Sequence, residues 1–300
     1  MTGPLMVAGV DTSTEGGWAA VTAWRLANAV SGRAVFVHAV SDAWVLPGHP
    51  PGITEHDIRR HLLLHAVNIV RASLGDRAPP GCLDCLEVRI GPAAHVLAET
   101  AVESGASLIV VGGKRHSALG RWLAGSTVHQ LLRTSDLPVL VATPSMARVR
   151  RVLVALDVDE TAASTIAAAE QLARRLGAKV RFVHALAPIP YALELEPLVD
   201  LTAMHDATMT EIEKSVWPLI ADPDAERFVR EGNPTAVIEV EARSWGADLV
   251  VVGHHGRSGF DRAVLGSVSY DLLHDLPASV MVVHPTAIPA PTPAITAGRP

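Results

Sequence analysis

Short apolar runs alternate along the chain with longer segments whose apolar residues recur at helical spacing. The runs of the second half lie at 152–156, 180–185, 227–230, 249–252 and 280–283. The helical segments between them lie at 161–176, 201–217, 235–245 and 262–273. Short continuous apolar runs are typical of strands buried on both faces. Their alternation with helices predicts right-handed βαβ crossovers and a five-stranded parallel sheet with helices on both faces.

The same pattern occurs twice. The interval from aspartate to histidine is 27 residues in both copies, from 11 to 38 and from 157 to 184. The interval between two glycines is likewise 21 residues, from 91 to 112 and from 232 to 253. We therefore expect two tandem doubly wound α/β domains, 1–146 and 147–285, followed by a disordered Pro- and Ala-rich tail at 286–300.

A glycine-rich segment follows the fourth apolar run of the second copy. It has the form G-x2-G-x9-G-S, with Gly253, Gly256, Gly266 and Ser267 at the named positions. Glycines allow close approach to a phosphate chain and positive φ, and the free N–H groups of a starting helix favour anions. Neither a Walker A motif nor G-x-G-x-x-G after a first strand is present. The segment predicts a nucleotide-phosphate site of another kind.

The first-strand aspartate, the Val-His-Ala ending of the second strand and this motif together resemble the universal stress protein family in its tandem form. The resemblance covers about residues 5–285. It implies the strand order 3-2-1-4-5 and ATP as the ligand, with which Mg²⁺ can bind. Asp157 and Ala155 would then lie at the ribose and adenine, and Ala185 would offer backbone atoms to the base. The residues implied for the triphosphate are Gly253, Gly256, Gly266, Ser267 and Val268.

Further residues of the motif are candidates for the phosphates. His254, His255 and Arg257 lie in the loop, where each histidine could approach a phosphate or be exposed to solvent. Ser269 could add a hydroxyl donor. Two simpler interpretations stay open: Asp157 as a helix cap or turn residue, and His184 as a strand-end histidine bonded to the backbone.

The first copy has most of the corresponding residues, which are Gly9, Asp11, Ala39, Gly112, Gly125 and Ser126. It departs from the motif at Arg115, which stands where the second copy has Gly256. If that position needs a left-handed backbone, a side chain costs about 1–2 kcal/mol there. We therefore expect the second half to be the stronger ATP site. Gly113 could let the first loop take another route, so ATP binding by the first copy stays open.

Charge and composition exclude several classes of protein. A net charge of -6 and a pI near 6.1 argue against a nucleic-acid partner, which needs accumulated Lys and Arg. No apolar run approaches the roughly 20 residues of a membrane span, so we expect a cytoplasmic protein. The pair Cys82 and Cys85 is interpreted as two reduced thiols. His61 and His65 could share a helix face but have no clear third ligand, so no metal site is expected.

The leading interpretation is a nucleotide-dependent signalling or stress-response regulator and not an enzyme. ATP would order the loop, and a protein partner or a second subunit would read the ordered surface. No local nucleophile motif such as G-x-S-x-G occurs. The alternatives are a slow Mg²⁺-dependent ATPase or phosphotransferase using Asp157 and a loop histidine, or an interaction module whose first copy has lost nucleotide. An open edge at the last strand of each copy predicts a homodimer.

Overall fold

The computed structural model describes most of the chain. The described residues are 3–41, 54–75, 82–116, 121–123, 125–144, 146, 148–186, 201–254 and 265–285. The tail at 286–300, expected to be disordered, lies outside them. Among the described residues, no helix has both the length and the apolar character needed to cross a membrane.

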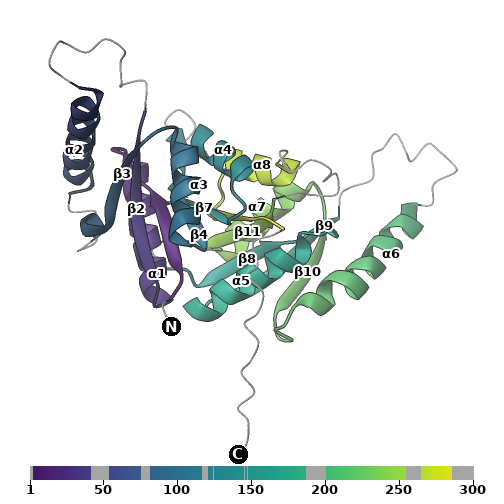
Figure 1. Ribbon diagram of the computed structural model, residues 1–300. Helices are drawn as coiled ribbons and strands as arrows, with labels where there is room; N and C mark the ends of the chain where they lie inside the picture. The colour runs from purple at the N-terminus through teal and green to yellow at the C-terminus, as the bar shows by residue number, and fades with distance from the viewer. Residues whose placement is uncertain are drawn as a thin grey trace, which may run out of the picture.

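A single ten-stranded sheet runs through both halves in the order β10-β9-β8-β11-β12-β7-β4-β1-β2-β3 (Figure 1). The strands of the first half are β1 (Leu5–Gly9), β2 (Arg33–Val40), β3 (Leu86–Ile90), β4 (Leu108–Gly112) and β7 (Val139–Ala142). Those of the second half are β8 (Arg151–Ala155), β9 (Lys179–Leu186), β10 (Glu226–Glu231), β11 (Leu249–Gly253) and β12 (Ser279–Val283). Neighbouring strands within a half are all parallel. Each half therefore has the predicted strand order 3-2-1-4-5.

The two halves are joined through their last strands. β7 and β12 pair antiparallel, with Leu140 opposite Met281. The expectation that each last strand leaves an open edge is therefore wrong, because the two edges pair with each other inside the chain. The outer strands of the sheet are β3 and β10. Self-association stays a prediction, without the argument from open edges.

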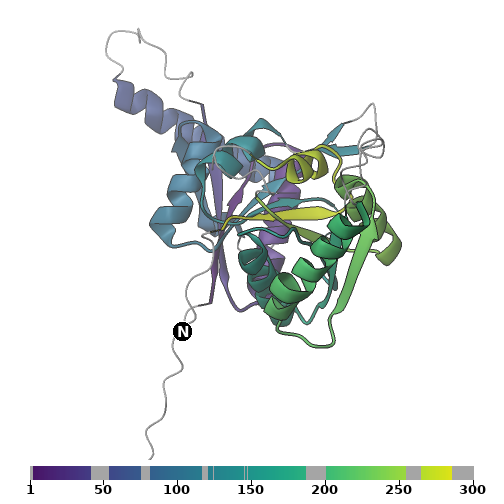
Figure 2. The same ribbon diagram turned by 90° about the vertical axis from the view of Figure 1, so that its right-hand side faces the viewer.

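Helices cover both faces of the sheet (Figures 1 and 2). One face carries α1 (Thr14–Ala29) and α5 (Ala162–Leu176). The other carries α3 (Ala93–Ser104), α4 (Ser126–Thr134), α7 (Pro234–Trp245) and α8 (Ser267–His274). The buried apolar residues on each face form one cluster with members from both halves. The halves thus share their two cores, because the sheet continues across the junction.

Two further helices lie at the outer ends of the sheet (Figure 1). α2 (Glu55–Leu74) packs beside β2 and β3, and α6 (Leu201–Glu211) belongs to the second half. α6 continues into a π-helical turn and a 3-10 turn, so the predicted helix 201–217 is regular only in its first part. α8 begins at Ser267, later than the predicted 262, because Leu265 and Gly266 are not helical.

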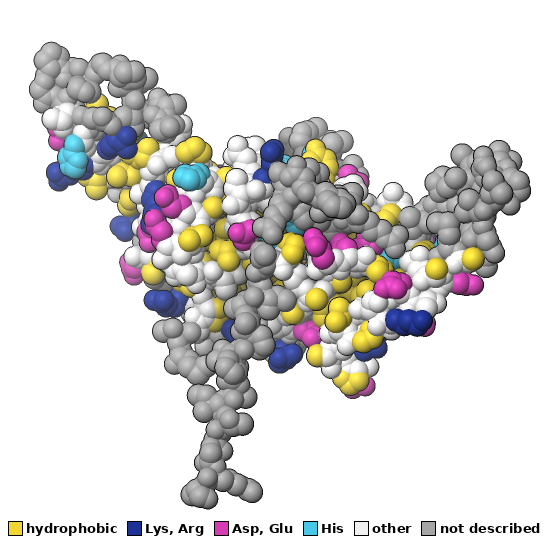
Figure 3. Space-filling view, turned by 45° about the vertical axis from the view of Figure 1, so that its right-hand side comes forward, with side chains coloured by type: hydrophobic (Ala, Val, Ile, Leu, Met, Phe, Trp, Pro, Cys, Tyr) yellow, Lys and Arg dark blue, Asp and Glu magenta, His cyan; other side chains and the backbone are white. Residues whose placement is uncertain are grey.

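Three short elements of the described chain were not predicted from the sequence. β5 (Lys114–His116) and β6 (Arg121–Leu123) form an antiparallel pair in the glycine-rich segment of the first half. A 3-10 turn, Cys82–Cys85, precedes β3, and the thiol of Cys85 is free and exposed. On the face shown in Figure 3, basic side chains are interspersed with acidic ones.

Candidate functional site

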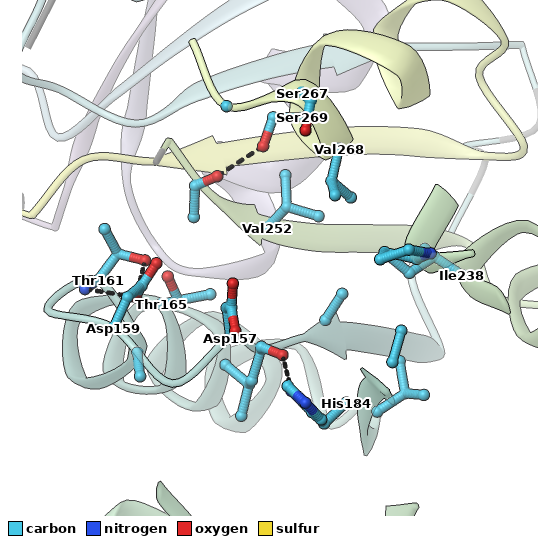
Figure 4. Close-up of a pocket in the computed structure, with 18 residues that line it drawn as sticks. Asp157, Asp159, Thr161, Thr165, His184, Ile238, Val252, Ser267, Val268 and Ser269 are labelled. Atoms are coloured by element: carbon cyan, nitrogen blue, oxygen red, sulfur yellow. Dashed lines mark hydrogen bonds between the residues drawn. The ribbon is translucent and has the colours of Figure 1, made fainter. Parts of the chain in front are cut away.

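A cavity of about 420 Å³ lies at the carboxyl ends of β8, β9 and β11, beside the starts of α5, α7 and α8 (Figure 4). In a doubly wound sheet this is where strand order reverses and where ligands bind. Eight residues predicted from the sequence line it: Ala155, Asp157, Ala185, Gly253, Gly266, Ser267, Val268 and Ser269. The structure therefore brings residues from three separate loops to one site.

One side of the cavity is apolar. Val183, Ile238, Val252 and Val268 line it, and Ile238 and Val252 are buried at 3% exposure each. These side chains come from β9, α7, β11 and α8. Apolar walls with a few polar groups are typical of small-molecule sites and suit a flat aromatic base.

Asp159 forms hydrogen bonds in the turn that leads into α5. Asp159 Oδ1 accepts hydrogen bonds from the Thr161 backbone N–H at 2.8 Å and from the Thr161 hydroxyl at 2.7 Å. In the first half the equivalent turn lies two residues earlier, where Asp11 accepts from the backbone N–H and the hydroxyl of Ser13. Asp157 accepts a bond from the next backbone N–H at 2.8 Å. The N-cap residue of α5 is Thr161, so the interpretation of Asp157 as a helix cap is wrong, whereas its interpretation as a turn residue stays open. Asp157 lines the cavity.

Asp159 also brings a second carboxyl group to the cavity. Its Oδ2 atom is buried and has no hydrogen-bond partner among the described residues, and the same is true of Thr165 Oγ1. Burial raises the pKa of the Asp159 carboxyl; the Thr161 hydrogen bonds oppose this shift, and the charge of Asp157 adds to it. Aligning the two copies of the repeat did not identify Asp159, because Asp157 aligns with Asp11 of the first copy whereas Asp159 aligns with Ser13.

His184 has the simpler of the roles considered for it. Its Nδ1 atom donates to the carbonyl oxygen of Leu156 at 2.8 Å, and the side chain is 5% exposed. His38 makes the same bond to Val10 in the first half, also at 2.8 Å. Both histidines therefore hold the second strand against the loop that follows the first strand.

The start of α8 faces the cavity as the motif predicts. Gly266 precedes the helix with φ −58°, and no side chain caps the first turn. The first backbone N–H groups of a helix carry partial positive charge and favour an anion. Ser269 differs from the expectation, because its hydroxyl donates to the carbonyl oxygen of Gly253 at 2.6 Å. That hydrogen atom is therefore already used within the protein.

Position 253 requires glycine because the start of α5 packs closely against it. A Cβ atom at this position would lie 2.2 Å from Thr161 Oγ1 and 3.3 Å from Thr165 Oγ1. Gly253 and Gly266 both have φ outside the left-handed region, so the expectation of positive φ at these two glycines is wrong. The requirement at Gly253 is close packing of β11 on the start of α5.

His254 is not an exposed loop residue. Its side chain is fully buried and stacks on His284, with ring centroids 4.3 Å apart. It does not line the cavity, and its carbonyl oxygen accepts the Gly266 N–H at 2.9 Å. The expected position of His254 at a phosphate or in solvent is therefore wrong. His255, Gly256 and Arg257 lie outside the described residues.

The first half has a smaller cavity of about 130 Å³ at the corresponding place. The predicted residues that line it are Gly9, Asp11, Ala39, Gly112 and Gly125, whereas Ser126 begins α4 without lining it. Leu97 lies against Gly9, since a Cβ atom on that glycine would be 2.8 Å from Leu97 Cδ1. The second half has Ala155 where the first has Gly9. The side chain of Leu97 therefore lies where a side chain at position 9 would stand, and it lines the smaller cavity.

Arg115 does not have the strained backbone considered for it. It lies in β5, paired with Trp122, and the only non-glycine residue of the described chain with positive φ is Ser31. The expected left-handed penalty at this position is therefore absent. The backbone at 114–116 is extended, as the alternative with Gly113 allowed.

The loop after the third strand of each half also reaches the cavity, which the sequence analysis missed. Pro234 and Ile238 line the second cavity, and Ala93 and Leu97 line the first. The repeated glycines Gly91 and Gly232 stand just before these loops and were used only as spacing marks. Their repetition in both copies was the sequence signal that the loop after the third strand also contributes to the cavity.

Comparison with known proteins identifies the family. The chain matches the model of the Universal stress protein family twice, over residues 5–143 and 148–284. A universal stress protein of Mycolicibacterium smegmatis is 29% identical over an alignment of 290 residues that covers 93% of this chain and 97% of the relative. One from Mycobacterium tuberculosis is 28% identical over 299 residues, covering 88% and 90%. The crystal structure of a universal stress protein from Archaeoglobus fulgidus shares the fold, with a TM-score of 0.62 at 18% identity over 94% of this chain and 98% of that one.

Proposed function

Because the chain belongs to the universal stress protein family, we propose that its second half binds ATP and that the protein is a nucleotide-dependent regulator of a stress response. The observation that carries this proposal is the cavity of about 420 Å³ that ends at the uncapped start of α8. Its volume falls in the range of small-molecule sites, about 300–1,000 Å³.

The two ends of the cavity suit the two ends of a nucleotide. The apolar side, with Ile238 and Val252, would hold the adenine, and the backbone of Ala185 would meet its edge. Asp157 would accept hydrogen bonds from the ribose hydroxyl groups. The backbone N–H groups of Ser267 and Val268 at the start of α8 would hold the phosphates.

The first half is proposed to bind ATP more weakly. Its cavity of about 130 Å³ is below the usual range for small-molecule sites. This proposal is supported by the position of Leu97, which lines the smaller cavity beside Gly9, and no longer by a backbone penalty at Arg115. An interaction role for the first half is compatible with this smaller cavity.

α8 offers a route by which occupancy of the cavity could reach the first half. Tyr270 and His274 lie on α8, and His129 lies on α4 of the first half. The His129 ring centroid is 5.3 Å from that of Tyr270 and 5.7 Å from that of His274. A nucleotide that orders the start of α8 would therefore act one turn away from the contact between halves. A partner protein would then bind the surface formed by α4 and α8 in this state.

We propose that the protein is not primarily an enzyme. A slow Mg²⁺-dependent ATPase is the second candidate, but two histidines near the site are already engaged. His184 bonds to Leu156, and His254 is buried against His284. Phosphate release from ATP, measured with and without Mg²⁺, tests this point. Release at several turnovers per minute would overturn the assignment as a non-enzyme.

The binding proposal is tested by nucleotide content and titration. The protein is purified, its bound nucleotide is counted per chain, and the stripped protein is titrated with ATP by calorimetry. We expect one tight site per chain and a second, weaker one or none. Absence of ATP from both experiments would contradict the proposal. The homodimer and the cytoplasmic location expected from the sequence stay predictions.

A further inference from the structure

One carboxyl group and two hydroxyl groups lie together where the start of α5 packs on Gly253. We call Asp159, Thr161 and Thr165 the α5 cluster. The hydroxyl groups of Thr161 and Thr165 both lie beside Gly253, 2.2 and 3.3 Å from where its Cβ would be. Asp159 and Thr165 line the cavity together with Asp157 (Figure 4). The cluster is therefore part of the wall of the proposed nucleotide site.

Two oxygen atoms of the α5 cluster lack a hydrogen-bond partner among the described residues. They are Asp159 Oδ2 and Thr165 Oγ1, and the Thr165 residue is 1% exposed. Buried polar atoms are nearly always bonded, and leaving one unbonded costs about 1–3 kcal/mol. A pair of such atoms in a cavity wall points to an occupant that bonds to oxygen atoms.

The first half has no equivalent pair. Ser13 stands where the second half has Asp159, each two residues after the first-strand aspartate. The Ser13 hydroxyl donates to Asp11 and accepts the Gly16 N–H at 3.1 Å. Ala19 stands where the second half has Thr165, each eight residues after that aspartate. The two unbonded oxygen atoms are therefore a property of the second half alone.

Charge indicates which occupant fits. Asp157 and Asp159 are both in the cavity wall, and no lysine or arginine is among the described residues that line it. A triphosphate would add further negative charge next to these carboxylates. A cation between them would reduce the repulsion, whereas water would satisfy hydrogen bonding without changing the charge.

We propose that Asp159 and Thr165 supply oxygen ligands to the divalent cation that would accompany the nucleotide in the second half. This inference rests on the proposed function of the same site. Mg²⁺ typically binds one or two carboxylates together with phosphate oxygens and water, and a threonine hydroxyl is a known ligand type for it. The first half, with Ser13 and Ala19, offers no such ligands.

The test compares ATP affinities in Mg²⁺ and in EDTA, measured by calorimetry on stripped protein. For the wild type we expect the tight site to bind at least about tenfold more strongly in Mg²⁺, a difference of about 1.4 kcal/mol. Asp159→Asn keeps an oxygen that can accept the bonds from Thr161 but removes the charge. We expect it to tighten binding in EDTA and to reduce the Mg²⁺ effect to less than about threefold.

Two further variants separate a ligand role from a structural one. Thr165→Val keeps the shape of the side chain and should reduce the Mg²⁺ effect without tightening binding in EDTA. Glu160→Gln makes the same charge change one residue away, at an exposed position that does not line the cavity. It should keep the wild-type Mg²⁺ effect. If the titration resolves two ATP sites, Asp159→Asn should change the Mg²⁺ effect at only one of them.

The outcomes distinguish this inference from the proposed function. Equal ATP affinity in Mg²⁺ and EDTA would overturn the cation inference and leave ATP binding intact. Equal weakening of both affinities by Asp159→Asn would also overturn it, since that is the result of a structural role. Failure of ATP to bind in either condition would overturn the proposed function and the inference with it.

Discussion

Ser269 donates its hydroxyl hydrogen atom to the carbonyl oxygen of Gly253 at 2.6 Å, which ties the first turn of α8 to the end of β11. Ser269 is 4% exposed, so the bond is largely shielded from water. We expect Ser269→Ala to lower the free energy of unfolding by about 1–3 kcal/mol, because the carbonyl oxygen would lose its donor. Urea denaturation of the nucleotide-free protein measures this.

Ser267 is the matched control, two residues earlier on the same helix. Its side chain is exposed, and no hydrogen bond caps the helix there. Ser267→Ala should therefore change the free energy of unfolding by less than about 0.5 kcal/mol. If both variants unfold at the same urea concentration as the wild type, the bond to Gly253 does not stabilise the site.

Gly253→Ala tests whether this glycine is required by packing or only by a ligand. The added Cβ would lie 2.2 Å from Thr161 Oγ1 and 3.0 Å from Thr161 Cβ. We expect a loss of about 1–3 kcal/mol in the free energy of unfolding without any nucleotide present. Adding Thr161→Ala should recover part of the loss. A Gly253→Ala protein as stable as the wild type would show that only a ligand needs the glycine.

The contact of His129 on α4 with Tyr270 and His274 on α8 is expected to depend on pH. Burial lowers the pKa of His129, and the charge of His274 lowers it further. Since the folded pKa is below the ordinary value of 6.5, this group's contribution to stability is present above that value and is lost as pH falls below it. We therefore expect the free energy of unfolding to decrease as the pH is lowered from about 7.5 to about 5.5.

His129→Phe keeps an aromatic ring beside Tyr270 and removes the titration. Its unfolding free energy should fall less over the same pH interval than that of the wild type. His95→Gln, at an exposed position on α3, is the control and should keep the wild-type dependence. The same slope in the wild type and His129→Phe would contradict this role of His129.

The alternation of apolar runs with helical segments was sufficient to predict parallel strands, and the equal spacing of Asp11 and His38 with Asp157 and His184 predicted two matching domains. The strand order came from the resemblance to the universal stress protein family. The sequence was not sufficient for the junction, because β7 and β12 have the apolar pattern of any buried strand. Their antiparallel pairing depends on how two complete domains meet, which no local pattern records.

The site was predicted best where it depends on backbone position. Gly266 and Ser267 begin α8 as the motif indicated, and Ala155 and Ala185 reach the cavity. One error concerns a side chain whose partner is distant in the sequence. His254 is buried by His284, thirty residues later (254 to 284). Asp159 was missed because it takes over the turn that Asp11 forms in the other half.

The central claim, that nucleotide binds in the second half, is tested most directly by the paired variants Asp157→Asn and Asp11→Asn. Both keep the shape of the side chain and remove one charge at equivalent positions of the two halves. Stripped wild-type and variant proteins are titrated with ATP by calorimetry in Mg²⁺. We predict that Asp157→Asn weakens the tight site at least about tenfold, because a hydrogen bond to a charged group contributes about 1.5–3 kcal/mol, and that Asp11→Asn leaves that site unchanged. Two equal sites in the wild type, or loss of the tight site in Asp11→Asn alone, would contradict the account.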